Sequence, residues 1–81
     1  MNKFQINYLD LNVDYTDSGK FRSYSLDTHG NGLQDMMLNA TIEVIDQDGD
    51  TLDTLGLDDC PKQVYTKAVL AIVDAYLIHS K

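Results

Sequence analysis

The sequence is poor in several residue types that carry structural or chemical roles. Of its 81 residues, one is cysteine, one is proline and none is tryptophan. A single cysteine excludes an intramolecular disulfide, and we expect a protein of a reducing compartment. One cysteine and two histidines also lack the paired spacing of a zinc site. We therefore expect no bound metal ion and no cofactor.

Long hydrophobic runs are also missing. The longest run spans residues 68–78 and is interrupted by Asp74, whereas a membrane-spanning helix needs about 20 apolar residues. Residues 1–5 contain no apolar segment typical of a signal peptide. We expect a cytoplasmic protein that does not contact a membrane. Apolar residues still make up 43% of the chain, which suffices for one globular domain over residues 1–81.

Basic residues are scarce and unevenly placed. Lysine and arginine number 6 against 13 acidic residues, which gives a formal net charge of −7. No basic residue lies between Arg22 and Lys62, an interval that holds nine acidic residues. A field of this sign opposes the approach of nucleic acid phosphates, so we expect no direct binding of nucleic acid.

The groups that enzymes use for covalent or acid–base catalysis are few. Cys60 lies at a predicted helix start, where a helix dipole can activate a thiol, but His29 and His79 are distant from it in the sequence. Residues 30–32 contain two glycines but lack the Lys-Ser/Thr that follows in a phosphate-binding loop. We expect no catalytic residue and a protein that is not an enzyme.

Alternating apolar residues predict two strands in the first third of the chain. The alternation over residues 4–8 and that over residues 9–15 have opposite parity, which predicts a β-bulge near Tyr8 and Leu9. Ser18 and Gly19 form the predicted two-residue turn of a hairpin. This turn predicts the cross-strand pairs Tyr15–Arg22, Val13–Tyr24 and Leu11–Leu26.

The second half of the chain predicts another hairpin and a helix. Residues 33–37 could begin a helix, but the alternation that runs from Leu38 through residue 44 favours a strand over residues 36–45. A turn at residues 46–50, of two residues or of three with a left-handed Gly49, leads to a fourth strand at 51–55. Residues 58–61 are typical of a helix start, and the helix runs to about His79. The predicted fold is α+β, a four-stranded antiparallel sheet of two hairpins with one C-terminal helix packed on one face.

The predicted helix has two different faces. Successive residues lie about 100° apart around its axis, so one side gathers the residues expected to face the sheet. These are Val64, Ala68, Ala71, Ile72 and Ala75. The opposite side is polar except for Leu70, Val73 and Leu77. This apolar stripe is either a surface for a partner or a second copy, or a tolerated exposure.

Acidic residues crowd around the predicted turn of the second hairpin, at Asp46, Asp48, Asp50 and Asp53. Aspartate is common in turns, so one interpretation is a solvated turn without further function. A second interpretation is calcium binding, but an EF-hand frame centred on the glycine of this loop would place Val44 and Leu55 at ligand positions. The third is an interaction surface whose crowded negative charge mimics nucleic acid phosphates.

In size, acidity and sheet-plus-helix build, the chain resembles the small acidic inhibitors that phages encode against host defence enzymes, including anti-CRISPR and anti-restriction proteins. The likeness is one of composition and build and includes no motif. It implies a protein-binding inhibitor that blocks a basic nucleic-acid-binding groove of a host protein. The predicted contact residues are Glu43, Asp46, Asp48, Asp50, Asp53, Asp58 and Asp59. The alternative is a small structural or accessory module that forms a weak homodimer through Leu70, Val73 and Leu77, with acidity serving solubility alone.

Overall fold

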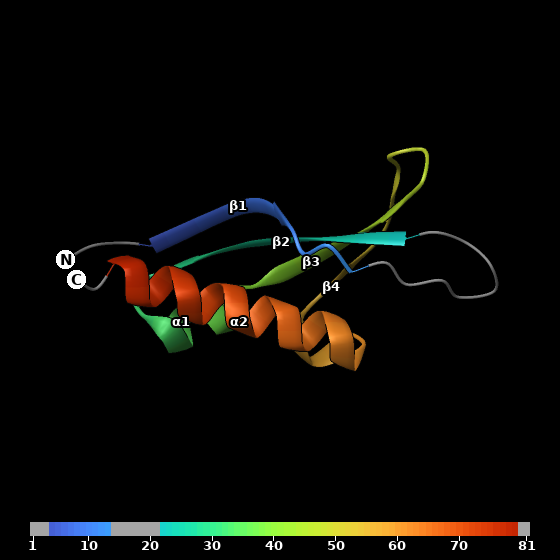
Figure 1. The fold of residues 1–81 in the computed structure, drawn as a ribbon. Coiled ribbons are helices and arrows are strands. Elements are labelled where there is room, and N and C mark those ends of the chain that lie inside the picture. The colour runs from blue at the N-terminus through green and yellow to red at the C-terminus, as the bar shows by residue number, and fades with distance from the viewer. Residues whose placement is uncertain (1–3, 14–21, 80–81) are drawn as a thin grey trace.

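The computed structural model describes residues 4–13 and 22–79, and these form an α+β fold. The elements in chain order are β1 (Phe4–Asp10), β2 (Arg22–Gly30), α1 (Leu33–Leu38), β3 (Thr41–Asp46), β4 (Thr51–Leu55), the 3-10 turn η1 (Leu57–Asp59) and α2 (Lys62–His79). The strands pair in sequence order as one antiparallel sheet. Helix α2 lies along one face of this sheet, and α1 lies on the same side (Figure 1). The predicted four-stranded sheet with a C-terminal helix on one face is confirmed.

The β1–β2 pairing contains the predicted bulge but has a different register. The register shifts between Ile6 and Leu9, and Tyr8 has a φ of 51°. Leu9, and not Leu11, lies opposite Leu26, while the amide of Leu11 donates a 3.0 Å hydrogen bond to the carbonyl of Tyr24. The predicted register was therefore wrong by two residues. A shift of two keeps every side chain on its face, so Leu26 and Tyr24 each have an apolar neighbour on β1 or just after it in both registers.

Strand β1 also ends earlier than predicted. It stops at Asp10, whose carboxylate accepts a 2.9 Å hydrogen bond from the amide of Asn12. Asn12 has a φ of 55°, a conformation that interrupts a strand. The predicted turn at Ser18 and Gly19 and the pairing of Tyr15 lie outside the described residues.

A short helix occupies part of the segment predicted to be a strand. Leu33–Leu38 form α1, so the helical alternative holds there, and β3 begins only at Thr41. The buried hydroxyl of Thr28 donates a hydrogen bond to the carbonyl of Met36, which fastens α1 to β2. The helix also approaches Gly30 so closely that an added Cβ would lie 2.7 Å from the amide nitrogen of Met36.

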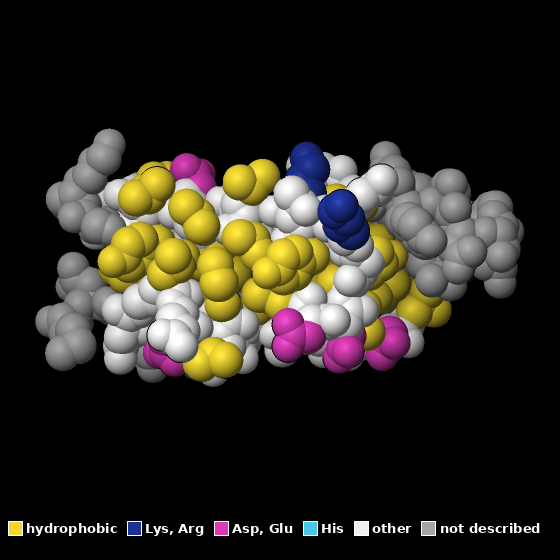
Figure 2. Space-filling model, turned by 90° about the horizontal axis from the view of Figure 1, so that it is seen from below, with side chains coloured by type: hydrophobic (Ala, Val, Ile, Leu, Met, Phe, Trp, Pro, Cys, Tyr) yellow, Lys and Arg dark blue, Asp and Glu magenta, His cyan; other side chains and the backbone are white. Residues whose placement is uncertain are grey.

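The outer side of α2 exposes apolar residues as predicted. Leu70 is 61% exposed and Leu77 is 56% exposed, while Val73 is half-buried between them. Figure 2 shows hydrophobic side chains in a band along this face of the molecule. The helix begins at Lys62, one residue after the predicted start, and its first turn is closed by the amide of Tyr65 donating to the carbonyl of Pro61.

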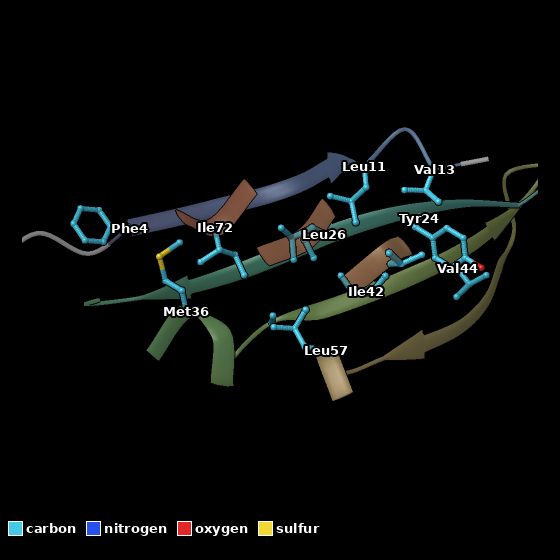
Figure 3. Close-up of a cluster of buried hydrophobic side chains, with 13 residues drawn as sticks. Phe4, Leu11, Val13, Tyr24, Leu26, Met36, Ile42, Val44, Leu57 and Ile72 are labelled. Carbon is cyan, nitrogen blue, oxygen red and sulfur yellow. The ribbon is translucent and has the colours of Figure 1, made fainter. Parts of the chain in front are cut away.

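The core lies between the sheet and α2. Figure 3 shows Leu26 and Ile42 of the central strands in one cluster with Ile72 of the helix. Val64, Ala68 and Ile72 are completely buried and Ala71 packs at the margin of the core, which confirms the predicted sheet-facing side of the helix.

Candidate protein-binding surface

The β3–β4 hairpin has a three-residue turn, which resolves the two alternatives for its loop. The amide of Asp46 donates to the carbonyl of Asp50 at 3.0 Å, and that of Gly49 donates to the carbonyl of Asp46 at 3.1 Å. Gly49 has a φ of 87°, the left-handed conformation that closes such a turn and that glycine adopts without strain.

The carboxylate of Asp46 holds this turn together. Its Oδ1 atom accepts hydrogen bonds from the amides of Asp48 at 2.9 Å and Asp50 at 3.0 Å. The residue is half-buried, and its backbone lies opposite that of Arg22 on β2. Asp46 therefore has a structural role at the base of the turn, and it presents Asp48 and Asp50 as exposed carboxylates at the tip.

The structure separates two other predicted contact residues onto opposite faces of the sheet. Asp53 lies opposite Val44, on the face that carries the core, but it is exposed because β4 is an edge strand. Glu43 lies opposite Ser25 and Thr54 on the other face and is half-buried. Asp53 is thus an exposed carboxylate along β4, whereas Glu43 lies on the opposite face.

Asp58 and Asp59 form a second acidic site at the other end of β4. Both are exposed in η1, just before α2 begins. The five residues of β4, which span roughly 17 Å at the usual rise per residue, lie between them and the tip, followed by Gly56 and Leu57. The predicted acidic contact residues therefore include two acidic sites, one at each end of β4, whose backbone course Figure 1 shows.

A groove that the sequence did not indicate lies beside η1. It has a volume of about 340 Å³, and its walls include Leu38 of α1, Leu57 and Asp58 of η1, and Tyr65 of α2. Leu38 was predicted to lie on a strand, where it would face the core, and in α1 it is 77% exposed. The groove therefore depends on a helix for which the residue pattern gave only an ambiguous signal.

The groups considered for catalysis lie apart. Cys60 precedes α2 and His79 ends it, so the length of the helix, roughly 27 Å, separates them. The Cys60 thiol donates to the carbonyl of Gly56 at 3.2 Å, and burial, aided by the charge of Asp59, raises the pKa of this thiol. A raised pKa disfavours the reactive thiolate. The ring of His79 lies 5.5 Å from that of Phe4 and has a packing role.

Two further properties concern the described residues 4–13 and 22–79. Within them no group of three or more histidine, cysteine, aspartate or glutamate side chains is placed to hold a metal ion. None of the helices found there is long and apolar enough to cross a membrane.

The arrangement provides exposed carboxylates on a stiff hairpin and beside a helix start, a combination suited to contacting positive charge. Comparisons with protein-family models, curated proteins and solved structures find no match for this chain.

Proposed function

We propose that the chain is a small non-enzymatic inhibitor that covers a basic nucleic-acid-binding groove of another protein. A phage protein directed against a host defence enzyme, such as an anti-CRISPR or anti-restriction protein, is the class that this description fits. The observation that carries the proposal is the row of exposed carboxylates along the β3–β4 edge, in an interval of sequence without lysine or arginine.

The spacing of the two acidic sites supports mimicry of a nucleic acid strand. Along the axis of a double helix each strand presents a phosphate every 3.4 Å or so, so the ~17 Å length of β4 corresponds to about five phosphate steps. Asp48 and Asp50 lie at one end of this distance, Asp53 lies along it, and Asp58 and Asp59 lie at the other end. The basic side chains of a groove that binds a phosphate backbone can pair with these carboxylates as they pair with phosphates.

The turn provides the stiffness that such mimicry needs. A flexible acidic segment loses conformational entropy when it binds, whereas side chains on a preformed hairpin lose less. The two hydrogen bonds to Asp46 Oδ1 and the left-handed Gly49 fix the tip before any partner arrives. The proposed contacts are therefore Asp48, Asp50, Asp53 and the η1 pair, with Asp46 positioning the first two.

The test compares two variants that carry the same change in net charge. Asp48→Asn/Asp50→Asn alters the tip, and Asp10→Asn/Asp27→Asn removes two carboxylates elsewhere, on β1 and β2, so the formal net charge of −7 becomes −5 in both. The unaltered protein is used to capture partners from a bacterial lysate, and association with the purified partner is measured at low and high salt. We expect the tip variant to associate roughly 3–10-fold more slowly at low salt and to show a flatter salt dependence, because local charge steers the encounter.

Competition with nucleic acid completes the test. If the partner groove is the binding site, then DNA or RNA that the partner binds displaces this chain in proportion to its own affinity. Simultaneous binding of nucleic acid and this chain would contradict the proposal. Equal slowing by the two paired variants would also contradict it, since only net charge would then matter.

A further inference from the structure

The exposed side of α2 carries apolar side chains that the fold leaves uncovered. Leu70 and Leu77 lie two helical turns apart on the same line, with Val73 beside them. On the flank toward α1, the band continues through Tyr65, which is 44% exposed and shares a groove with Leu38. Figure 2 shows this band running along the molecule.

The area of this band sets the strength of any association. A fully exposed leucine side chain presents on the order of 100 Å² of apolar surface, and a tyrosine side chain about twice that. At the exposures observed, Leu38, Tyr65, Leu70 and Leu77 together present on the order of 300 Å² per molecule. A standard stable interface buries about 800 Å² per partner, so this band is suited to a weak complex.

The charges that flank the band are complementary to those of a second copy. Lys67 and Asp74 lie on one flank of the Leu70–Leu77 line, and Asp58 lies on the other flank, in the groove beside Tyr65. Figure 2 shows lysine or arginine side chains together with an acidic side chain on one edge of the hydrophobic band, and only acidic charged side chains on the opposite edge.

A two-fold axis brings these charges together for either helix direction. With the two α2 helices parallel, each flank meets the opposite flank of the other copy, so Lys67 approaches Asp58. With the helices antiparallel, each flank faces the same flank of the other copy, running in the opposite direction. Lys67 then approaches Asp74 of the second copy. Closed two-fold pairing is also the commonest symmetry of soluble oligomers.

We propose that the stripe of Leu70, Val73 and Leu77 is the centre of a weak homodimer interface between two copies of this chain. The β3–β4 tip projects on the side of the sheet away from α2 (Figure 1), so the dimer leaves Asp48 and Asp50 accessible. The inference does not rest on the inhibitor proposal, and the two surfaces share only Asp58, in the arrangement with parallel helices.

Sedimentation equilibrium between 10 µM and 1 mM tests the inference. We expect the average mass to rise above the monomer mass of 9.1 kDa, with a dissociation constant on the order of 100 µM. Leu70→Lys/Leu77→Glu should weaken the association at least tenfold. Leu52→Lys is the matched control, because Leu52 is 51% exposed on β4, away from this face, and its replacement should leave the association unchanged. Lys67→Glu should weaken it as well, since it places like charges across the interface.

Three results would overturn the inference. These are a parent protein that stays monomeric at 1 mM, a stripe double variant that associates as strongly as the parent, and a loss of association in the Leu52→Lys control. If circular dichroism shows that the charged double variant does not fold, Leu70→Gln/Leu77→Gln takes its place, because glutamine keeps a high helix propensity. The glutamine variant must then be monomeric under the conditions in which the parent dimerises.

Discussion

Replacing Asp46 by alanine tests whether this carboxylate holds the hairpin turn. The substitution removes the acceptor of two backbone amides, those of Asp48 and Asp50, at 2.9 and 3.0 Å. A hydrogen bond of this kind contributes about 0.5–1.5 kcal/mol net, and the freed amides at the exposed tip can bind water instead. We expect Asp46→Ala to lower the free energy of unfolding by about 1–2 kcal/mol. For a domain of this size that loss lowers the melting temperature by roughly 5–15 °C.

Two matched variants separate the hydrogen bonds from the charge. Asp46→Asn keeps an oxygen at the same position and should cost less than half as much as Asp46→Ala. Asp48→Ala removes a charge from an exposed side chain at the tip and should change stability by no more than about 0.5 kcal/mol. Urea unfolding of the four proteins measures these differences. If Asp46→Ala and Asp48→Ala are equally stable, the turn does not depend on this carboxylate, and Asp46 returns to the set of contact residues.

Two further predictions concern the packing of α1 and the cysteine. Gly30→Ala should destabilise the fold by about 2–3 kcal/mol, because the new Cβ would lie 2.7 Å from the backbone of α1. Gly56→Ala is the control and should be nearly neutral, since its Cβ would enter open space. Equal losses of stability in urea unfolding of the two variants would refute this prediction. Cys60→Ser should leave partner binding unchanged. Because the pKa of the Cys60 thiol is raised, iodoacetamide at pH 8 should alkylate Cys60 more slowly in the native protein than in urea. Faster alkylation of the native protein would contradict the interpretation of Cys60 as an unreactive thiol.

The sheet and α2 could be predicted because their residue periodicity matches the surfaces that they bury. Ile42 and Val44 alternate with polar residues, and both are buried in β3. Val64, Ala68 and Ile72 recur at helical spacing and are completely buried in α2. In these elements the local pattern and the tertiary packing favour the same structure.

Helix α1 could not be assigned in the same way, because its stability is tertiary. A helix of six residues is too short to be stable alone. It is held by the Thr28 hydroxyl, which donates to the carbonyl of Met36, and by close packing on Gly30. Both partners lie on β2, so the sequence of Leu33–Leu38 does not contain the interactions that decide its structure.

The β1–β2 register shows a different limit of the residue pattern. Leu26 can oppose either Leu9 or Leu11 with an apolar neighbour and an unchanged sheet face. Only the bulge at Tyr8 and the left-handed Asn12, which ends the regular pairing, select the observed register. The change of parity indicates the bulge, but the alternation of residues 9–15 continues past Asn12 and does not show where the regular pairing ends.

The acidic turn raises the question of which aspartates are available to a partner. Asp46, Asp48 and Asp50 alternate identically in the sequence, and aspartate serves equally as a turn former and as a surface charge. Only the first of the three has both following amides within reach of its carboxylate, because the chain reverses after it and directs those amides back toward it. A carboxylate oxygen that already accepts two amide protons has less capacity for an arginine or lysine of another protein. The surface that a basic partner can use is therefore narrower than the sequence implies: Asp48 and Asp50 at the tip, Asp53 along β4, and the η1 pair. Asp46 fixes the position of the tip and contributes less to the contact than Asp48 and Asp50 do.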